Sequence, residues 1–173
     1  MRYLRLLILI TSTFASILSH AASARATPCS APEYRQFDFW LGDWEVTNPA
    51  GKVAGHNHVT REYGGCVLQE HWAGTGGSLG SSFNIYDPVR KVWHQTWVDN
   101  TGTLLELEGG LKDGSMVLSG EQVQADGKDL LNRITWTPIQ VGGDRKVRQL
   151  WETSADGGKT WAVAFDGLYA KSH

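Results

Sequence analysis

The segment SFNIYDPVRKVWHQTWV, residues 82–98, carries the pattern that decides the fold, two β-rich runs joined by a short turn. Within each run, aromatic and β-branched residues alternate with polar ones, which is the period of a half-buried strand. Residues 87–91 between them include Pro88 and Asp87, residue types that favour a tight reversal. Because a connection this short joins antiparallel neighbours, the segment predicts a β-hairpin.

The same alternation of run and turn continues over most of the chain. The gaps between runs are rich in Gly, Asn, Asp and Pro, and no window shows the sustained three-and-four spacing of a long helix. We therefore predict an all-β meander of about nine or ten antiparallel strands. The further runs occupy residues 43–47, 56–63, 66–72, 104–109, 116–123, 132–138, 147–154 and 161–169.

A sheet of this kind must bury one of its faces. The sequence provides no helices to cover it, so closing the sheet on itself is the natural solution, and closure also removes the unpaired edges. We predict a single antiparallel up-and-down barrel. A sandwich of two sheets made from the same strands is the structural alternative.

The first 26 residues have the organisation of a secretory signal peptide. Arg2 and Arg5 precede an apolar run at residues 6–10, and two Ala-x-Ala sites follow at residues 22–24 and 24–26. Polar residues 11–13 interrupt the apolar stretch, so we expect no stable membrane insertion. This order predicts export to the periplasm or the exterior, with residues 27–173 forming the single barrel domain.

The charge of the exported chain limits the kinds of partner that we expect, and its cysteine content predicts a disulfide. Of the 16 basic residues three lie in the signal, which leaves 13 basic against 18 acidic residues. A mildly acidic surface without lysine and arginine clusters argues against nucleic acid and anionic membranes. The two cysteines, Cys29 and Cys66, are expected to form one disulfide in an oxidising compartment.

A Gly-x-Trp motif, Gly42-Asp43-Trp44, stands at the start of the first run, within FDFWLGDWEV (residues 37–46). Lipocalins and their calycin relatives place this motif at the same point, where the Trp closes one end of the barrel and packs against an arginine of a late strand. Arg148 is the candidate for that arginine. By this resemblance, residues 37–40 form a short turn or one-turn helix over the barrel's base, with Trp40 and Trp44 as plugs.

The resemblance extends over nearly all of residues 27–173. The segments FDFWLGDWEV, GGCVLQEHWAG, SFNIYDPVRKVWHQTWVD, LEGGLKDG and SADGGKTWAVAFDGLY together resemble a family of exported bacterial proteins of unknown function. That family is described as having a lipocalin-like barrel, so the resemblance implies the same fold here. It brings no catalytic residues.

SADGGKTW, residues 154–161, matches the turn called an Asp-box, which recurs in sialidase propellers. Here it occurs once, between two predicted strands. Asp156 can accept hydrogen bonds from the turn backbone, Gly157 and Gly158 can take positive φ angles, and Trp161 can pin the hairpin. We interpret it as structural.

Strand parity predicts which side chains face the interior, because alternate residues share one face. The faces that carry the largest aromatics also carry a few carboxamides, Gln149 among them, and a carboxylate. That mixture suits a cavity for a small apolar or aromatic molecule, although a scaffold with a filled core is a further alternative. The predicted ligand-contacting residues are Glu70, Trp72, Asn84, Tyr86, Gln95, Trp97, Arg133, Arg148 and Trp151.

Glu70 is the best candidate for catalysis in such a cavity. Walled by Trp72 and Trp97, its carboxyl would have a raised pKa and could move a proton near neutral pH. With Arg133 or Arg148 binding a substrate carboxylate, this chemistry predicts an alternative function, a cofactor-independent decarboxylase, cyclase, isomerase or lyase for an aromatic substrate. Nucleophilic catalysis finds no support, because the cysteines are expected to pair and no Ser–His–Asp set is suggested by position, and no cofactor is expected.

A metal site is the competing chemistry. His56, His58 and Glu62 have the His-x-His-x3-Glu spacing that cupins use for iron, manganese or zinc. The second cupin motif is missing, and His71 or His94 could complete a site only in a favourable register, so we predict no metal. A haem-binding barrel of the nitrobindin type would need an axial histidine, for which His173 is the candidate.

Overall fold

The computed structural model describes residues 27–172; the predicted signal peptide and His173 lie outside that range. The described chain contains ten strands and three short 3-10 helices. The strands are β1 Gly42–Thr47, β2 Val53–Glu62, β3 Val67–Gly74, β4 Leu79–Asp87, β5 Val92–Asp99, β6 Leu104–Lys112, β7 Ser115–Val123, β8 Asp129–Val141, β9 Asp144–Ser154 and β10 Ala162–Lys171. The helices are η1 Pro32–Arg35, η2 Asp38–Trp40 and η3 Tyr63–Gly65.

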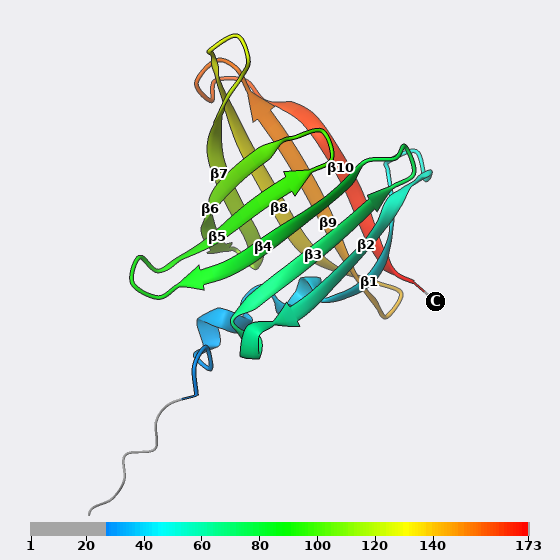
Figure 1. The fold of residues 1–173 in the computed structure, drawn as a ribbon. Helices are drawn as coiled ribbons and strands as arrows, with labels where there is room; N and C mark the ends of the chain where they lie inside the picture. The colour runs from blue at the N-terminus through cyan, green and yellow to red at the C-terminus, as the bar shows by residue number, and fades with distance from the viewer. Residues whose placement is uncertain (1–26, 173) are drawn as a thin grey trace, which may run out of the picture.

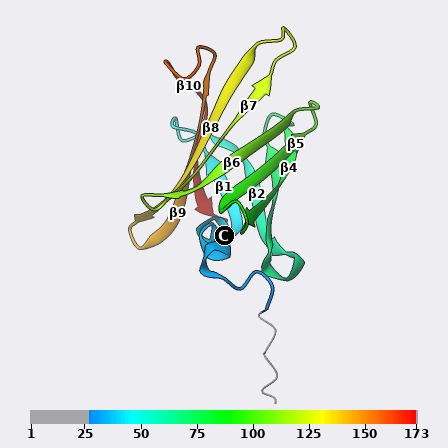
Figure 2. The same cartoon turned by 90° about the vertical axis from the view of Figure 1, so that its left-hand side faces the viewer.

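The ten strands form one closed barrel. Each strand pairs antiparallel with its neighbours in sequence, and β1 completes the ring by pairing with both β2 and β10 (Figures 1 and 2). In the hairpin of residues 82–98, Asn84 lies opposite Gln95, which is the pairing of two inward side chains. The predicted up-and-down barrel is therefore confirmed, and the sandwich alternative is wrong.

The turns form where turn-favouring residues stand. Between β4 and β5, the Asp87 carboxylate accepts hydrogen bonds from the backbone N–H groups of Val89 and Arg90, at 2.8 and 3.1 Å. Lys91 then adopts a positive φ of 58°, a left-handed conformation that completes the reversal. Local side-chain bonding thus sets the register of this hairpin.

The Asp-box segment forms the β9–β10 turn, as its structural interpretation predicts. Asp156 accepts the backbone N–H groups of Lys159 and Thr160, both at 2.9 Å. Gly157 and Gly158 have φ angles of 70° and 86°, and the Trp161 indole N–H donates to the Gly158 carbonyl at 3.1 Å.

The N-terminal segment closes the base of the barrel. In Figure 1 its helices, in blue, lie across the lower end of the strands. Phe37 and Trp40 are fully buried there, and Phe37 stacks on Trp40 with ring centroids 4.9 Å apart. The Trp44 indole N–H donates to the Trp40 carbonyl at 2.8 Å, and Trp44 is fully buried. The predicted short helix with two tryptophan plugs is confirmed.

The cation that packs against the Gly-x-Trp tryptophan is not the predicted one. Lys171 Nζ lies 3.9 Å from the centroid of the Trp44 ring and donates to the Leu41 carbonyl at 2.8 Å. Arg148 instead pairs with Asp166 on the outside of the barrel. The prediction for Arg148 was wrong because its side chain points to the opposite face of β9 from Val147 and Gln149, which face inward.

The predicted disulfide joins Cys29 to Cys66. It ties the segment before η1 to the connection between β2 and β3, so the base helices are covalently attached to the barrel wall. The Arg35 guanidinium supports this attachment by donating to the Cys29 carbonyl at 3.1 Å.

Within residues 27–172, no helix has the length and apolar character needed to cross a membrane.

Candidate functional site

The upper part of the barrel contains a cavity of about 340 Å³. Its rim includes Ala54, Ser78 and Ala164, which stand next to strand connections at the end opposite the N-terminal helices. Ser78 and Ala164 are exposed, whereas Trp136 and Tyr169 at the bottom are buried in the base core. The base is thus packed and the other end is hollow.

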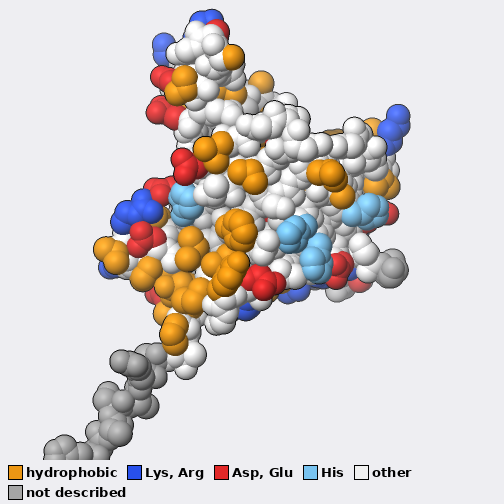
Figure 3. Space-filling view, in the orientation of Figure 1, with side chains coloured by type: hydrophobic (Ala, Val, Ile, Leu, Met, Phe, Trp, Pro, Cys, Tyr) orange, Lys and Arg blue, Asp and Glu red, His pale blue; other side chains and the backbone are white. Residues whose placement is uncertain are grey.

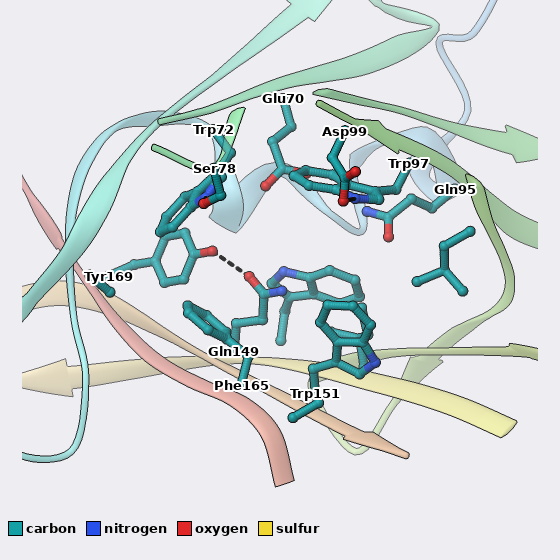
Figure 4. A pocket seen from close by; sticks show the side chains of 15 residues that line it. Glu70, Trp72, Ser78, Gln95, Trp97, Asp99, Gln149, Trp151, Phe165 and Tyr169 are labelled. Carbon is teal, nitrogen blue, oxygen red and sulfur yellow. Dashed lines mark hydrogen bonds between the residues drawn. The ribbon is translucent and has the colours of Figure 1, made fainter. Parts of the chain in front are cut away.

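Four half-buried aromatic side chains form the cavity walls: Trp72, Trp97, Trp151 and Phe165 (Figure 4). Each indole N–H already has a protein acceptor. Trp72 donates to Ser78 Oγ at 3.1 Å, Trp97 to Asp99 at 3.3 Å, and Trp151 to Asn132 at 2.9 Å. The walls therefore present ring carbon surface to the cavity instead of N–H groups.

Glycines seat three of these rings: those of Trp72 and Trp97 rest on glycines of a neighbouring strand, and that of Phe165 rests on a glycine of its own strand, β10. A Cβ atom on Gly80 would lie 2.2 Å from Trp97 Cζ2, and one on Gly167 would lie 2.5 Å from Phe165 Cε1. A Cβ atom on Gly55 would lie 2.7 Å from the Trp72 ring. Because each ring occupies the space of a missing side chain, it rests against the barrel wall and leaves the cavity open.

Glu70 lies at the polar side of the cavity floor. Its side chain is 5% exposed, and its two oxygens accept hydrogen bonds from Asn57 Nδ2 at 2.7 Å and Ser82 Oγ at 2.6 Å. Burial raises the pKa of Glu70 to about 7, because the two hydrogen bonds offset only part of the desolvation. Within residues 27–172 it forms no ion pair.

Carboxamide side chains form a hydrogen-bond network that holds Ser82, one of the two hydrogen-bond partners of Glu70, in place. Ser82 Oγ accepts a hydrogen bond from Asn84 Nδ2 at 2.9 Å, and Asn84 Oδ1 accepts one from Gln95 Nε2 at 2.8 Å. Asn84 also donates to the Leu68 carbonyl at 3.1 Å, which fixes its orientation. Gln95 lines the cavity, and Asn84 supports it from behind.

Across the floor from Glu70, the Tyr169 hydroxyl donates to Gln149 Oε1 (Figure 4). Burial and the nearby Glu70 charge raise the pKa of Tyr169 well above its ordinary value, so the phenol stays protonated. The indole N–H of Trp136, also in the lining, is buried and has no hydrogen-bond partner among the described residues.

Five of the nine predicted ligand-contacting residues line the cavity; Asn84 lies behind Gln95. Tyr86 lies at the other end, where its ring contacts Tyr34 at 5.4 Å and Trp93 at 6.1 Å between centroids. It shares the inward face of β4, but parity carries no information on depth along the barrel. The five are Glu70, Trp72, Gln95, Trp97 and Trp151.

The two predicted arginines lie outside the cavity. Arg133 pairs with Glu152 at 2.9 Å and lies 4.0 Å from the Trp161 ring centroid. Arg148 pairs with Asp166 at 2.7 Å. Both predictions were wrong for the same reason, since each arginine stands on the outward face of its strand, where a charged head remains in contact with water.

Sequence reasoning missed several lining residues, among them Asp99, Gln149, Phe165 and Tyr169. Asp99 and Gln149 share faces with Trp97 and Trp151, so parity contained the signal. Phe165 shares the inward face of β10 with Gly167 and Tyr169, so parity contained its signal too. Ala164 lies outside that alternation, and it lines the cavity because a register shift between Val163 and Phe165 turns two successive residues toward it.

The residues of the competing metal prediction do not form a site. His56 and His58 are exposed on the outer face of β2, and His58 pairs with Asp43 of the neighbouring strand. Figure 3 shows histidine side chains at the surface over this side of the barrel. Over residues 27–172, no group of three or more His, Cys, Asp or Glu side chains could hold a metal ion. His173 lies outside the described residues.

No protein-family model matches this chain, and no curated protein matches it significantly. The resemblance to exported bacterial barrels of unknown function therefore stays a prediction, and function must be argued from the cavity.

Proposed function

We propose that this barrel binds a small, largely aromatic or apolar molecule in its cavity. The observation that carries the proposal is a cavity of about 340 Å³ that opens at one end and has four aromatic walls and a polar floor. Ligand sites in proteins are typically concave, mostly apolar and equipped with a few convergent polar groups, and begin at about 300 Å³. A scaffold with a filled core would pack this end as tightly as the base.

We also propose that the protein acts after export, in the periplasm or outside the cell. Support comes from the disulfide between Cys29 and Cys66, a bond that persists in oxidising compartments. The order of basic, apolar and small residues in the first 26 positions points the same way.

Fluorescence titration tests the binding proposal, since four of the eight tryptophans line the cavity. We expect saturable quenching by small aromatic compounds, and roughly tenfold weaker binding in Trp97→Leu, because a lost ring contact costs about 1.4 kcal/mol. Phe83→Leu is the matched control, since Phe83 is an exposed aromatic on the outer face of β4. The absence of any saturable change in a folded protein would reject the proposal.

A second candidate is a cofactor-independent enzyme that uses the same cavity. The favouring observation is Glu70, whose pKa of about 7 allows it to accept or donate a proton at neutral pH. Neither Arg133 nor Arg148 lines the cavity, so no arginine among the described lining residues would bind a substrate carboxylate. The decarboxylase alternative, which needs such a cation to hold its substrate, is therefore not supported. Proton transfer in an isomerase, cyclase or lyase reaction does not need a cation that binds a substrate carboxylate.

Glu70→Gln separates the two candidates. In an enzyme we expect this substitution to remove turnover while the affinity for the same compound changes by less than about threefold, because only the proton-transfer step is lost. In a binding protein, no compound that quenches the fluorescence is converted, and wild type and Glu70→Gln give the same product-free chromatogram.

A further inference from the structure

Over residues 27–172, the cavity lining contains acidic side chains and no basic ones. Among the described residues that line it, two carry carboxyl groups, Glu70 on the floor and Asp99 near the rim, and none is a lysine, arginine or histidine. Figure 4 shows both carboxyl groups pointing into the space between the aromatic walls. A ligand in this cavity therefore meets carboxyl groups and no cationic side chain.

Three basic side chains of the strands around the cavity make their contacts elsewhere. Arg133 pairs with Glu152 and Arg148 with Asp166, both on the outer surface. Lys171 lies against Trp44 at the base. None of these cations neutralises the two carboxyl groups of the cavity.

Asp99 is held in its ionised form by the β5–β6 turn. Its burial would raise the pKa, but hydrogen bonds from Thr101, Thr103 and Trp97 outweigh that effect and bring the pKa to about 2. The backbone N–H groups of Thr101 and Thr103 donate to Asp99 Oδ1 at 2.9 and 3.2 Å. The rim thus carries a full negative charge at neutral pH, with no ion-pair partner among residues 27–172.

The walls add a second feature that attracts positive charge. Aromatic ring faces attract cations through their quadrupole, with indole the strongest, and Trp72, Trp97 and Trp151 have their N–H groups occupied by the protein. At the floor and near the rim, the carboxyl oxygens of Glu70 and Asp99 are hydrogen-bond acceptors on residues that line the cavity. Acceptors and ring faces fit a ligand that brings donors and positive charge.

We infer that the ligand is an organic cation, a molecule with an aromatic or apolar body and an ammonium group held between Asp99, Glu70 and the indole rings. The inference rests on the proposed binding function and names its ligand class. An anion of the same shape would lose its hydration and face two carboxyl groups without a compensating partner, which is unfavourable.

Three probes that share a phenylethyl-sized body separate the charge classes: 2-phenylethylamine, 2-phenylethanol and phenylacetate. We would measure their affinities by tryptophan fluorescence at pH 8, where the amine is protonated. The expected order is the amine at least tenfold tighter than the alcohol, with no saturable binding of phenylacetate. Raising the salt concentration should reduce the advantage of the amine, since part of it is electrostatic.

Variants locate the charge recognition. Asp99→Asn keeps an oxygen for the Thr101 and Thr103 N–H groups and removes the charge, so we expect the preference for amine over alcohol to fall at least fivefold, and further in combination with Glu70→Gln. The matched control is Asp126→Asn, an exposed acid of the β7–β8 turn that pairs with Lys128. Circular dichroism spectra establish that each variant is folded.

Each adverse result has a distinct meaning. If the alcohol binds as tightly as the amine, the inference is overturned and the binding function stands. A preference for the amine that persists in Asp99→Asn with Glu70→Gln also overturns it, because recognition then lies elsewhere. If no probe binds to the folded protein, and no compound of the wider aromatic panel gives saturable quenching, the proposed function fails, and the inference fails with it.

Discussion

Glu70 is a carboxyl group whose surroundings favour its neutral form. It accepts only two hydrogen bonds, from Asn57 and Ser82, and burial outweighs them, so its pKa rises from 4.5 to about 7. Between these pH values the folded protein holds a proton that the unfolded chain has released. The free energy of unfolding must therefore fall as the pH rises through this window.

We predict that the free energy of unfolding falls by roughly 2–3 kcal/mol between pH 5 and pH 8 because of Glu70, since one pKa unit corresponds to about 1.4 kcal/mol. Guanidinium denaturation of wild type and Glu70→Gln at both pH values measures the effect. The substitution should remove this part of the pH dependence, and any constant cost of the substitution cancels in the comparison. An equal pH dependence in both proteins would show that Glu70 ionises normally.

Strand β4 shows how a glycine shapes the cavity. Gly80 lies opposite Asp99 in the β4–β5 pairing, and the Trp97 ring covers the place where a Cβ atom of residue 80 would stand. Trp97 faces the cavity but leans diagonally across the neighbouring strand instead of projecting into the barrel. The space that a ligand would use thus depends on the absence of a side chain on the next strand.

We predict that Gly80→Ala destabilises the protein by about 1–3 kcal/mol, because the added methyl group forces the Trp97 ring toward the cavity. Ligand affinity should fall with it, and the near-ultraviolet circular dichroism should change. Gly110→Ala is the matched control, because a Cβ atom at that strand position meets no atom within 4 Å. Similar losses in both variants would assign the effect to the backbone and not to the seating of Trp97.

The two ends of the barrel differ in packing. One end is packed by the N-terminal segment, with Phe37, Trp40 and Trp44 fully buried, and the disulfide at Cys29 holds that segment to the wall. The other end contains the cavity. Stability and ligand binding should therefore respond to different substitutions.

We predict that replacing both Cys29 and Cys66 with serine lowers the free energy of unfolding by up to about 4 kcal/mol, the chain-entropy value for a loop of 37 residues. The affinity of the cavity for its ligand should change by less than about twofold, because the bond lies at the far end. Chemical denaturation and fluorescence titration of the same variant measure both quantities. A parallel loss of affinity would show that the base and the cavity are coupled.

Local sequence patterns were sufficient for the strands, the turns and the closed meander. Alternation and turn chemistry act over a few residues, so the hairpin of residues 82–98 could be predicted without knowledge of the rest. The inward faces of β3 and β5 followed from the same period, which brought Glu70 and Trp97 into the predicted site. The disulfide followed from there being only two cysteines.

The sequence alone therefore determined the barrel and most of its inward faces, while the depth and shape of the cavity depended on contacts between distant segments. Tyr86 faces inward but lies at the packed end, because the N-terminal segment fills that end and not the other. Ala164 lines the cavity beside Phe165 through a register shift that strand parity cannot reveal. Periodicity specifies which face a side chain occupies, whereas its height in the barrel depends on strand stagger and on which side chains the rest of the chain brings beside it.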